Sequence, residues 1–241
     1  MDRTIIFLHG YGVRGWFWDD FAQLFTSANG GGFDRILTPD LNMTDIDTLF
    51  ETTTRLVADE AKKQGPVYLV GHSLGGAVAA VVTGRLGEQA VAGIACIATP
   101  FGGNRSSGKS LTRFLIKHRM IPQFVARPRF FGTTPLAVQK AMFAKVSPES
   151  PALADAIMAD TYSHTKLLSR ALSIPAIVVC SEADRIVPVS QCRQLSAQLG
   201  ADIYVFERAR RIGHDDFVGA PPTASEVRTI ISNFFARGSH A

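Results

Sequence analysis

Short apolar segments alternate along the chain with longer segments in which apolar residues recur at helical spacing. The short segments predict strands at residues 4–9, 34–38, 67–71, 91–98, 175–181 and 202–207. The longer segments predict helices at residues 18–28, 45–64, 74–87, 188–199 and 223–236. This alternation is typical of an α/β domain, in which helices flank a mostly parallel sheet. Residues that follow such strands share one edge of the sheet, where sites form.

The alternation is interrupted between the fourth and fifth predicted strands. Residues 101–172 show no convincing strand pattern, and a connection of this length is rarely without a function. Helix-like pieces near 108–120, 134–146, 150–160 and 162–172 are separated by Pro122, Pro128, Pro135, Pro148 and Pro151. We therefore predict a single domain over residues 1–241 that carries a helical cap, or lid, at residues 101–172.

A candidate catalytic motif lies between the third strand and the following helix. The residues Gly71-His72-Ser73-Leu74-Gly75 match G-x-S-x-G, the pattern of a nucleophile elbow. The serine in such a turn has a strained backbone, and side chains two positions before and after it would collide, which explains Gly71 and Gly75. Ser73 is therefore the candidate nucleophile. The pentapeptide alone also fits an ordinary loop, so its partners decide.

A serine nucleophile needs a histidine base that a carboxylate orients. Asp184 comes just after the strand predicted at 175–181, and His214 follows the strand predicted at 202–207. The two residues and Ser73 should therefore share one sheet edge. Asp215 and Asp216 adjoin His214 and are alternative acids, but a carboxylate on the loop of the neighbouring strand can reach the far side of the ring.

Four motifs together resemble the α/β-hydrolase superfamily over nearly the whole chain. They are His9-Gly10, the turn from Gly71 to Gly76, the Asp184 loop and Gly213-His214, and the order of nucleophile, acid and histidine is that of the superfamily. The resemblance implies an α/β-hydrolase fold with a helical cap. It also implies that the backbone N–H groups of Tyr11 and Leu74 bind the oxyanion.

Several aromatic residues are candidates for contact with an acyl group. Trp16 lies on the first loop, and Phe101 belongs to Thr99-Pro100-Phe101-Gly102, which resembles a turn of lipases and related esterases. Phe114 and Phe124 belong to the apolar residues of the lid. For at least one of Trp16, Phe17 and Trp18 on the first loop, core packing is the favoured interpretation. For His72 we predict local packing, and for His9 a hydrogen bond that orders the first loop.

The lid carries the positive charge of the chain. The formal net charge is +4, yet residues 101–148 contain nine basic residues and no acidic one: Arg105, Lys109, Arg113, Lys117, Arg119, Arg127, Arg129, Lys140 and Lys145. Three interpretations remain open: a solvated basic face, attraction of an anionic substrate or carrier, and attraction to an acidic lipid surface.

Other classes of function find little support in the residues. We find no metal-binding, dinucleotide or P-loop motif, so no cofactor and no metal ion is expected. The basic lid lacks a recognised nucleic-acid-binding module, and no apolar stretch approaches the ~20 residues that span a bilayer. Cys96, Cys180 and Cys192 form no framework, which favours buried thiols and a cytoplasmic location, with a mature secreted form as the alternative.

These observations predict an esterase-like or lipase-like serine hydrolase that cleaves carboxylic esters through an acyl-enzyme. An acyl thioesterase or acyltransferase that acts on carrier-bound acyl groups shares the same chemistry and is the close alternative. An acyl-binding protein without catalysis is the alternative of another class, although it would not need a complete Ser73, His214 and Asp184 set.

Overall fold

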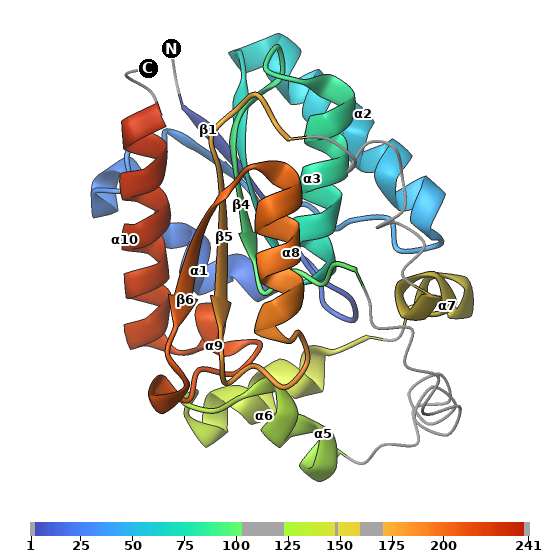
Figure 1. The fold of residues 1–241 in the computed structure, drawn as a ribbon, viewed down its shortest axis with the longest axis vertical. Helices are drawn as coiled ribbons and strands as arrows, with labels where there is room; N and C mark the ends of the chain where they lie inside the picture. The colour runs from blue at the N-terminus through green and yellow to red at the C-terminus, as the bar shows by residue number, and fades with distance from the viewer. Residues whose placement is uncertain (1–2, 103–122, 148, 160–170, 239–241) are drawn as a thin grey trace.

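The computed structural model describes residues 3–102, 123–147, 149–159 and 171–238 of the chain. Its centre is one sheet of six parallel strands in the order β2-β1-β3-β4-β5-β6 (Figure 1). The strands are β1 (Thr4–Leu8), β2 (Arg35–Leu37), β3 (Val67–His72), β4 (Val91–Ile97), β5 (Ala176–Ser181) and β6 (Asp202–Phe206). All six agree with the predicted strands, and the predicted α/β class is confirmed.

Helices cover both faces of the sheet. The α-helices that flank the sheet are α1 (Asp19–Gln23), α2 (Ile46–Gln64), α3 (Leu74–Leu86), α8 (Val189–Leu199), α9 (Asp216–Gly219) and α10 (Pro221–Gly238). Short 3-10 helices are η1 (Gly15–Trp18), η2 (Ser27–Asn29) and η5 (Arg208–Arg210). Helices α2, α3 and α8 pack on one face, and α1, α9 and α10 pack on the other.

Each strand contributes apolar residues to both layers, as the period of two requires. In β1, for example, Ile6 and Leu8 join the cluster under α2, α3 and α8, whereas Ile5 and Phe7 join the cluster under α1, α9 and α10. The second cluster is rich in aromatic rings, and Phe7 lies 5.1 Å from Trp18 between ring centroids. Because all six strands are parallel, the loops that follow them lie at one edge of the sheet.

The predicted helix at residues 18–28 is wrong in extent. It is divided into η1, α1 and η2, because the carbonyl of Phe25 accepts the N–H of Phe33 at 3.2 Å instead of continuing a helical ladder. A Cβ on Gly31 would lie 2.1 Å from the carbonyl carbon of Phe25, so only glycine permits this close turn.

Three described helices follow the fourth strand: α5 (Gln123–Phe130), α6 (Leu136–Lys145) and α7 (Pro151–Ala159). We use the word cap for the described residues between 123 and 159 that carry these helices. Helices α5 and α6 lie across the carboxyl ends of the strands (Figure 1). Helices α6 and α7 match predicted pieces, whereas α5 was not predicted, because Pro128 lies inside it rather than bounding it. The pieces predicted near 108–120 and 162–172 lie outside the described residues, except for 171–172, which are not helical.

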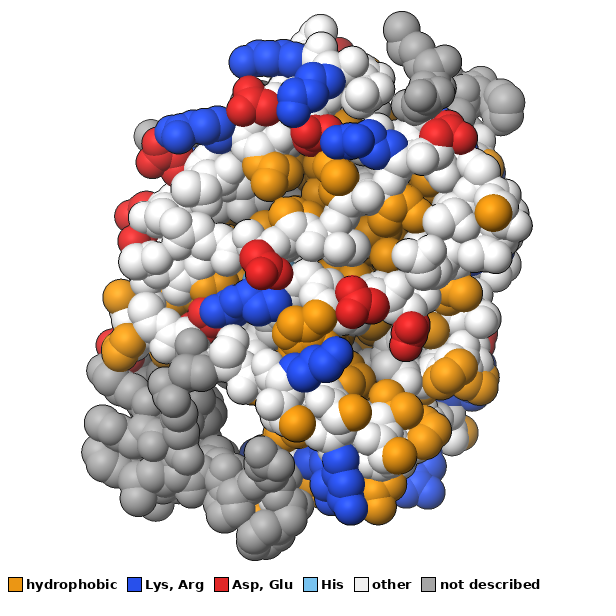
Figure 2. Space-filling model, turned by 180° about the vertical axis from the view of Figure 1, so that it is seen from behind, with side chains coloured by type: hydrophobic (Ala, Val, Ile, Leu, Met, Phe, Trp, Pro, Cys, Tyr) orange, Lys and Arg blue, Asp and Glu red, His pale blue; other side chains and the backbone are white. Residues whose placement is uncertain are grey.

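The described part of the basic segment lies mainly on these helices. Arg105, Lys109, Arg113, Lys117 and Arg119 lie outside the described residues, and Arg127, Arg129, Lys140 and Lys145 lie inside them. Seen from behind, hydrophobic and basic side chains gather at the lower end of the molecule, where α6 lies (Figure 2). Within the described ranges, no helix has both the length and the apolar character that crossing a membrane requires.

Candidate active site

Ser73 occupies a sharp turn between β3 and α3. Its φ of 54° and ψ of −124° are unusual for a residue with a side chain, and a conformation of this kind costs about 1–3 kcal/mol. The N–H of Ser73 donates to the carbonyl of Ile97 at 2.8 Å, and the carbonyl of Ser73 accepts the N–H of Gly76 at 3.0 Å. The fold thus holds the strained turn from both sides.

The glycines around Ser73 are required by close backbone contacts. A Cβ on Gly71 would lie 2.2 Å from the carbonyl oxygen of Gly75, and a Cβ on Gly75 would lie 2.0 Å from the carbonyl oxygen of Leu8. A Cβ on Gly76 would meet Oγ1 of Thr99 at 1.8 Å. The sequence interpretation of Gly71 and Gly75 as steric requirements therefore agrees with the structure.

His214 and Asp184 form a buried pair at the same edge of the sheet. The distance between Nδ1 of His214 and Oδ2 of Asp184 is 2.9 Å, and their side chains are 3% and 1% exposed. Oδ1 of Asp184 accepts the N–H groups of Ile186 and Val187 at 2.7 and 3.0 Å. The loop after β5 thereby fixes the carboxylate, which leaves Nε2 of His214 for another partner.

The pair also determines the charge preference of His214. Burial disfavours the imidazolium, but the negative charge of Asp184 and its hydrogen bond outweigh burial, and they raise the pKa of His214 above its ordinary value. Asp215 adds to the same effect. His214 can accordingly accept a proton more readily than a free imidazole does.

His72 links the Ser73 turn to the His214 loop. Its Nε2 donates to the backbone carbonyl of His214 at 2.8 Å, and the two rings lie 4.7 Å apart between centroids. The ring of Phe17 covers His72 at 4.9 Å, and burial keeps the pKa of His72 well below its ordinary value. Neutral His72 therefore packs, as predicted, and it also positions the backbone of His214.

The loop after β1 passes directly beside Ser73. A Cβ on Gly10 would lie 3.0 Å from Cβ of Ser73, so the chain between His9 and Tyr11 adjoins the candidate nucleophile. His9 accepts the N–H of Leu41 at Nε2 and donates from Nδ1 to the carbonyl of Gly10, both at 2.9 Å. Burial lowers the pKa of His9 to about 4, and the neutral ring orders this loop.

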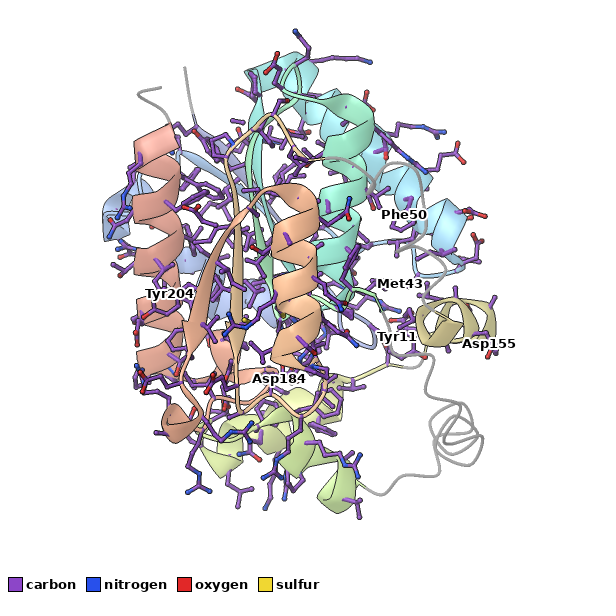
Figure 3. The ribbon with its side chains drawn as sticks, viewed as in Figure 1. Tyr11, Met43, Phe50, Asp155, Asp184 and Tyr204 are labelled. Carbon is purple, nitrogen blue, oxygen red and sulfur yellow. The ribbon has the colours of Figure 1, made fainter. Side chains whose placement is uncertain are left out.

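The candidate oxyanion residues are Leu74, which follows Ser73 in the sequence, and Tyr11, which follows Gly10 on the loop beside Ser73. Leu74 is the first residue of α3, where backbone N–H groups lack partners within the helix. Tyr11 follows Gly10 and is 37% exposed; Figure 3 shows it at the same end of the molecule as Asp184. Two cap contacts hold this loop: Ser147 N–H donates to the carbonyl of Gly12 at 3.0 Å, and Glu149 pairs with Arg14.

Asp216 has a structural role that the sequence did not distinguish from that of Asp215. Its Oδ2 accepts the N–H groups of Gly132, Thr133 and Gly213 at 2.7, 2.8 and 2.7 Å. Its Oδ1 accepts the N–H and the hydroxyl of Thr134 at 2.9 and 2.6 Å. The fully buried carboxylate therefore ties the cap to the residue that precedes His214.

The candidate substrate contacts are dispersed. Trp16 lines a groove of about 460 Å³ between α1 and α6, whose lining does not include Ser73, and Nζ of Lys145 lies 5.2 Å from its ring. Phe101 is half-buried beside Gln191, which accepts its N–H at 3.2 Å. Phe114 and the side chain of Phe124 lie outside the described residues. Among the described residues of α5, Phe130 adjoins the site, since its ring lies 5.9 Å from the ring of His214.

One cluster of potential metal ligands occurs within the described part of the chain. Ligand atoms of His72, His214 and Asp215 lie within 4.8 Å of one another. Hydrogen bonds already engage Nε2 of His72 and Nδ1 of His214, so the cluster follows from the arrangement of the pair and its support.

A parallel sheet with a glycine-enclosed serine turn after one strand and a carboxylate–histidine pair at the same edge defines the α/β-hydrolase class. The family model described as "Alpha/beta hydrolase family" matches residues 5–222. The chain therefore belongs to the alpha/beta hydrolase family, and the resemblance that the sequence motifs indicated is confirmed. A comparison with curated proteins found no matching sequence.

Several solved structures share the fold. A monoacylglycerol lipase of Paleococcus ferrophilus is 17% identical with a TM-score of 0.70, over 99% of this chain and 95% of that one. An esterase of Rhodococcus sp. is 22% identical with a TM-score of 0.71, over 97% and 91%. A bromoperoxidase of Bacillus anthracis is 16% identical with a TM-score of 0.74, over 98% and 92%. At these identities the likeness concerns the fold.

Proposed function

We propose that the protein is a serine hydrolase of carboxylic esters, with Ser73, His214 and Asp184 as its catalytic triad. The observation that carries the proposal is the strained conformation of Ser73, at φ 54° and ψ −124°, on the sheet edge that also bears the buried His214–Asp184 pair. Strain of this kind persists where the surrounding structure over-determines it, and it concentrates at active sites.

In the proposed reaction, Oγ of Ser73 attacks the ester carbonyl while Nε2 of His214 takes its proton. Asp184 holds Nδ1 of His214 and stabilises the imidazolium that forms. The N–H groups of Tyr11 and Leu74 bind the oxyanion of the tetrahedral intermediate. The leaving alcohol takes the proton from His214, and water activated by His214 then hydrolyses the acyl-enzyme, which regenerates Ser73.

The proposed substrate is an ester with an apolar acyl group. Support comes from Phe130, whose ring lies beside that of His214, and from structural neighbours that are named as an esterase and a lipase. Because other neighbours are bromoperoxidases, the acyl acceptor and the reaction need a direct test.

Labelling with a fluorophosphonate probe tests the nucleophile. We expect one equivalent of probe to attach to Ser73 in the wild-type protein, whereas the Ser73→Ala variant should remain unlabelled and lose about 10⁴-fold or more of the ester-hydrolysis kcat. Peptide mass spectrometry identifies the labelled residue, and circular dichroism checks that the variant folds. Labelling at another serine, or a variant that keeps a tenth of the wild-type kcat, would refute the assignment.

A panel of ester, thioester and lactone substrates with graded acyl length tests the substrate class. If the protein is an ester hydrolase, kcat/KM should be higher for esters than for the thioesters and lactones, with a maximum at one acyl-chain length. The Ser73→Ala substitution should abolish the hydrolysis of these esters. If thioesters instead react fastest, the chemistry is retained but the proposed substrate class is wrong.

A further inference from the structure

A second cavity lies outside the groove at Trp16 and adjoins the His214–Asp184 pair. Its volume is about 490 Å³, and its lining includes residues of α5, of the loop between β5 and α8, and of the segment between β6 and α9. Four of the lining residues are arginines: Arg129, Arg185, Arg208 and Arg211. Figure 3 shows Asp184, which also lines the cavity, at the end of the sheet beside the cap helices.

Among the residues that the structure describes, the arginines of this cavity have no carboxylate partner, although acidic groups lie nearby. The lining contains two carboxylates, Glu182 and Asp184. Asp184 accepts a hydrogen bond from His214, and Oε2 of Glu182 accepts the backbone N–H of Arg208 at 3.2 Å. Across the described ranges, none of the four guanidinium groups forms an ion pair. The neighbouring Arg210, by contrast, pairs with Glu226 at 2.6 Å.

We propose that this cavity binds the phosphate groups of a small phosphorylated molecule. Guanidinium groups donate two parallel hydrogen bonds to phosphate oxygens, and several arginines around one hollow suit a group with more than one negative charge. The volume falls within the range of about 300–1,000 Å³ that small-molecule sites occupy, and it exceeds what a single phosphate ion fills. A concave site favours a small molecule over a flat bilayer.

The lining of this cavity includes Asp184 of the proposed triad, but it includes neither Ser73 nor Tyr11 nor Leu74, so binding here does not require the proposed nucleophile or the oxyanion residues. Binding can therefore be measured whether or not the protein hydrolyses esters. The Ser73→Ala variant should bind the phosphate probe as the wild-type protein does, and loss of ester hydrolysis would leave the binding result unaffected.

Isothermal titration calorimetry with inorganic pyrophosphate on the full chain tests the proposal. The Arg185→Gln/Arg208→Gln variant should bind pyrophosphate at least about tenfold more weakly than the wild-type protein, because charge-assisted hydrogen bonds are lost. The matched control is Arg193→Gln/Arg237→Gln, which removes two exposed arginines outside the cavity and should leave the affinity unchanged. Equal weakening in both variants would show a general charge effect and overturn the proposal.

Two further measurements separate the alternatives. Arg129→Lys keeps the charge but not the paired donors, so it should weaken pyrophosphate binding even if the double variant fails to fold. Malonate and vesicles that contain phosphatidic acid serve as competing probes. Tighter binding of malonate than of pyrophosphate would overturn the phosphate class, and binding to vesicles without binding to pyrophosphate would assign the surface to lipid.

Discussion

Three carboxylates near His214 differ in what they bind. Asp184 holds Nδ1 of the ring, and Asp216 accepts backbone N–H groups of the cap and of Gly213. Asp215 lies between them in the sequence, and its Oδ1 is 3.8 Å from Nε2 of His72. Burial raises the pKa of Asp215 to about 7, so it is protonated in much of the acidic range.

These differences predict unequal effects of substitution to asparagine. In Asp184→Asn, the amide should turn its NH₂ group toward Nδ1 of His214 and force the proton onto Nε2, so kcat for ester hydrolysis should fall by about 10⁴-fold. Asp215→Asn resembles the protonated carboxyl and should cost less than about tenfold. Steady-state kinetics of both variants measure this order, and the reverse order would assign the triad acid to Asp215.

The distinction between these residues marks a limit of the sequence at the residue scale. The tight turn at Ser73 could be predicted because its glycines reflect local crowding, and the placement of Asp184 beside His214 because Asp184 follows a buried strand. Asp215 and Asp216 are adjacent and chemically identical, and only the folded cap supplies the N–H groups that Asp216 accepts. The role of Asp216 therefore depends on a contact between segments that are more than 80 residues apart in the sequence.

At the scale of elements, the cap and the His214 loop share one anchor. Asp216 joins Gly132, Thr133 and Thr134 to Gly213, and Asp215 N–H also donates to the carbonyl of Phe130 at 2.9 Å. The cap segment 130–134 is consequently fixed to the residues around His214. Movement of either element would disturb the other.

Substitution of this anchor should reduce stability and activity together. In Asp216→Asn, an NH₂ group replaces one acceptor oxygen and faces buried N–H donors, so the free energy of unfolding should fall by about 3 kcal/mol or more. The kcat/KM for ester hydrolysis should also fall, since Gly213 loses its acceptor. Urea denaturation and kinetics measure both effects.

The matched control for this prediction is Asp202→Asn, which changes an exposed carboxylate at the start of β6. We expect it to alter neither property appreciably. If Asp216→Asn behaves like this control, the hydrogen bonds of Asp216 do not support the cap.

Prediction of the elements was reliable where periodicity was strong. The strands of the sheet are buried on both faces and bounded by turns, so their apolar runs identified them. Helix α1 was overestimated because its end depends on the tertiary pairing of Phe25 with Phe33, which no local pattern reveals. Helix α5 was missed because Pro128 favours an end of a helix rather than its interior.

At the scale of the whole molecule, two apolar layers enclose several titratable side chains that stay neutral. His9 lies fully buried between the first loop and the segment after β2, and its folded-state pKa of about 4 is below the ordinary 6.5. The unfolded chain therefore binds a proton at His9 more readily than the folded protein does. The contribution of His9 to stability is present above pH 6.5 and is lost as the pH falls toward 4.

Replacement of His9 should thus flatten the acid dependence of stability. In His9→Gln, the amide oxygen can still accept the N–H of Leu41 but carries no proton in this range. Between pH 7 and pH 4, the free energy of unfolding of the wild-type protein should fall by about 3 kcal/mol more than that of the variant. Asp215 and His72 are present in both proteins, so the difference isolates His9. Parallel curves in chemical denaturation at these pH values would contradict the prediction.

The single carboxylate of Asp216 also has a consequence for the exchange of amide protons with solvent. The N–H groups of Gly132, Thr133 and Gly213 share its Oδ2, although Gly213 is far from the other two in the sequence. None of the three can open independently without leaving a buried charge with fewer donors. In deuterium oxide, we expect these three amides to exchange at the same rate, because one cooperative opening exposes all of them. Exchange at Gly132 and Thr133 of the cap would then report the same opening as exchange at Gly213 next to His214.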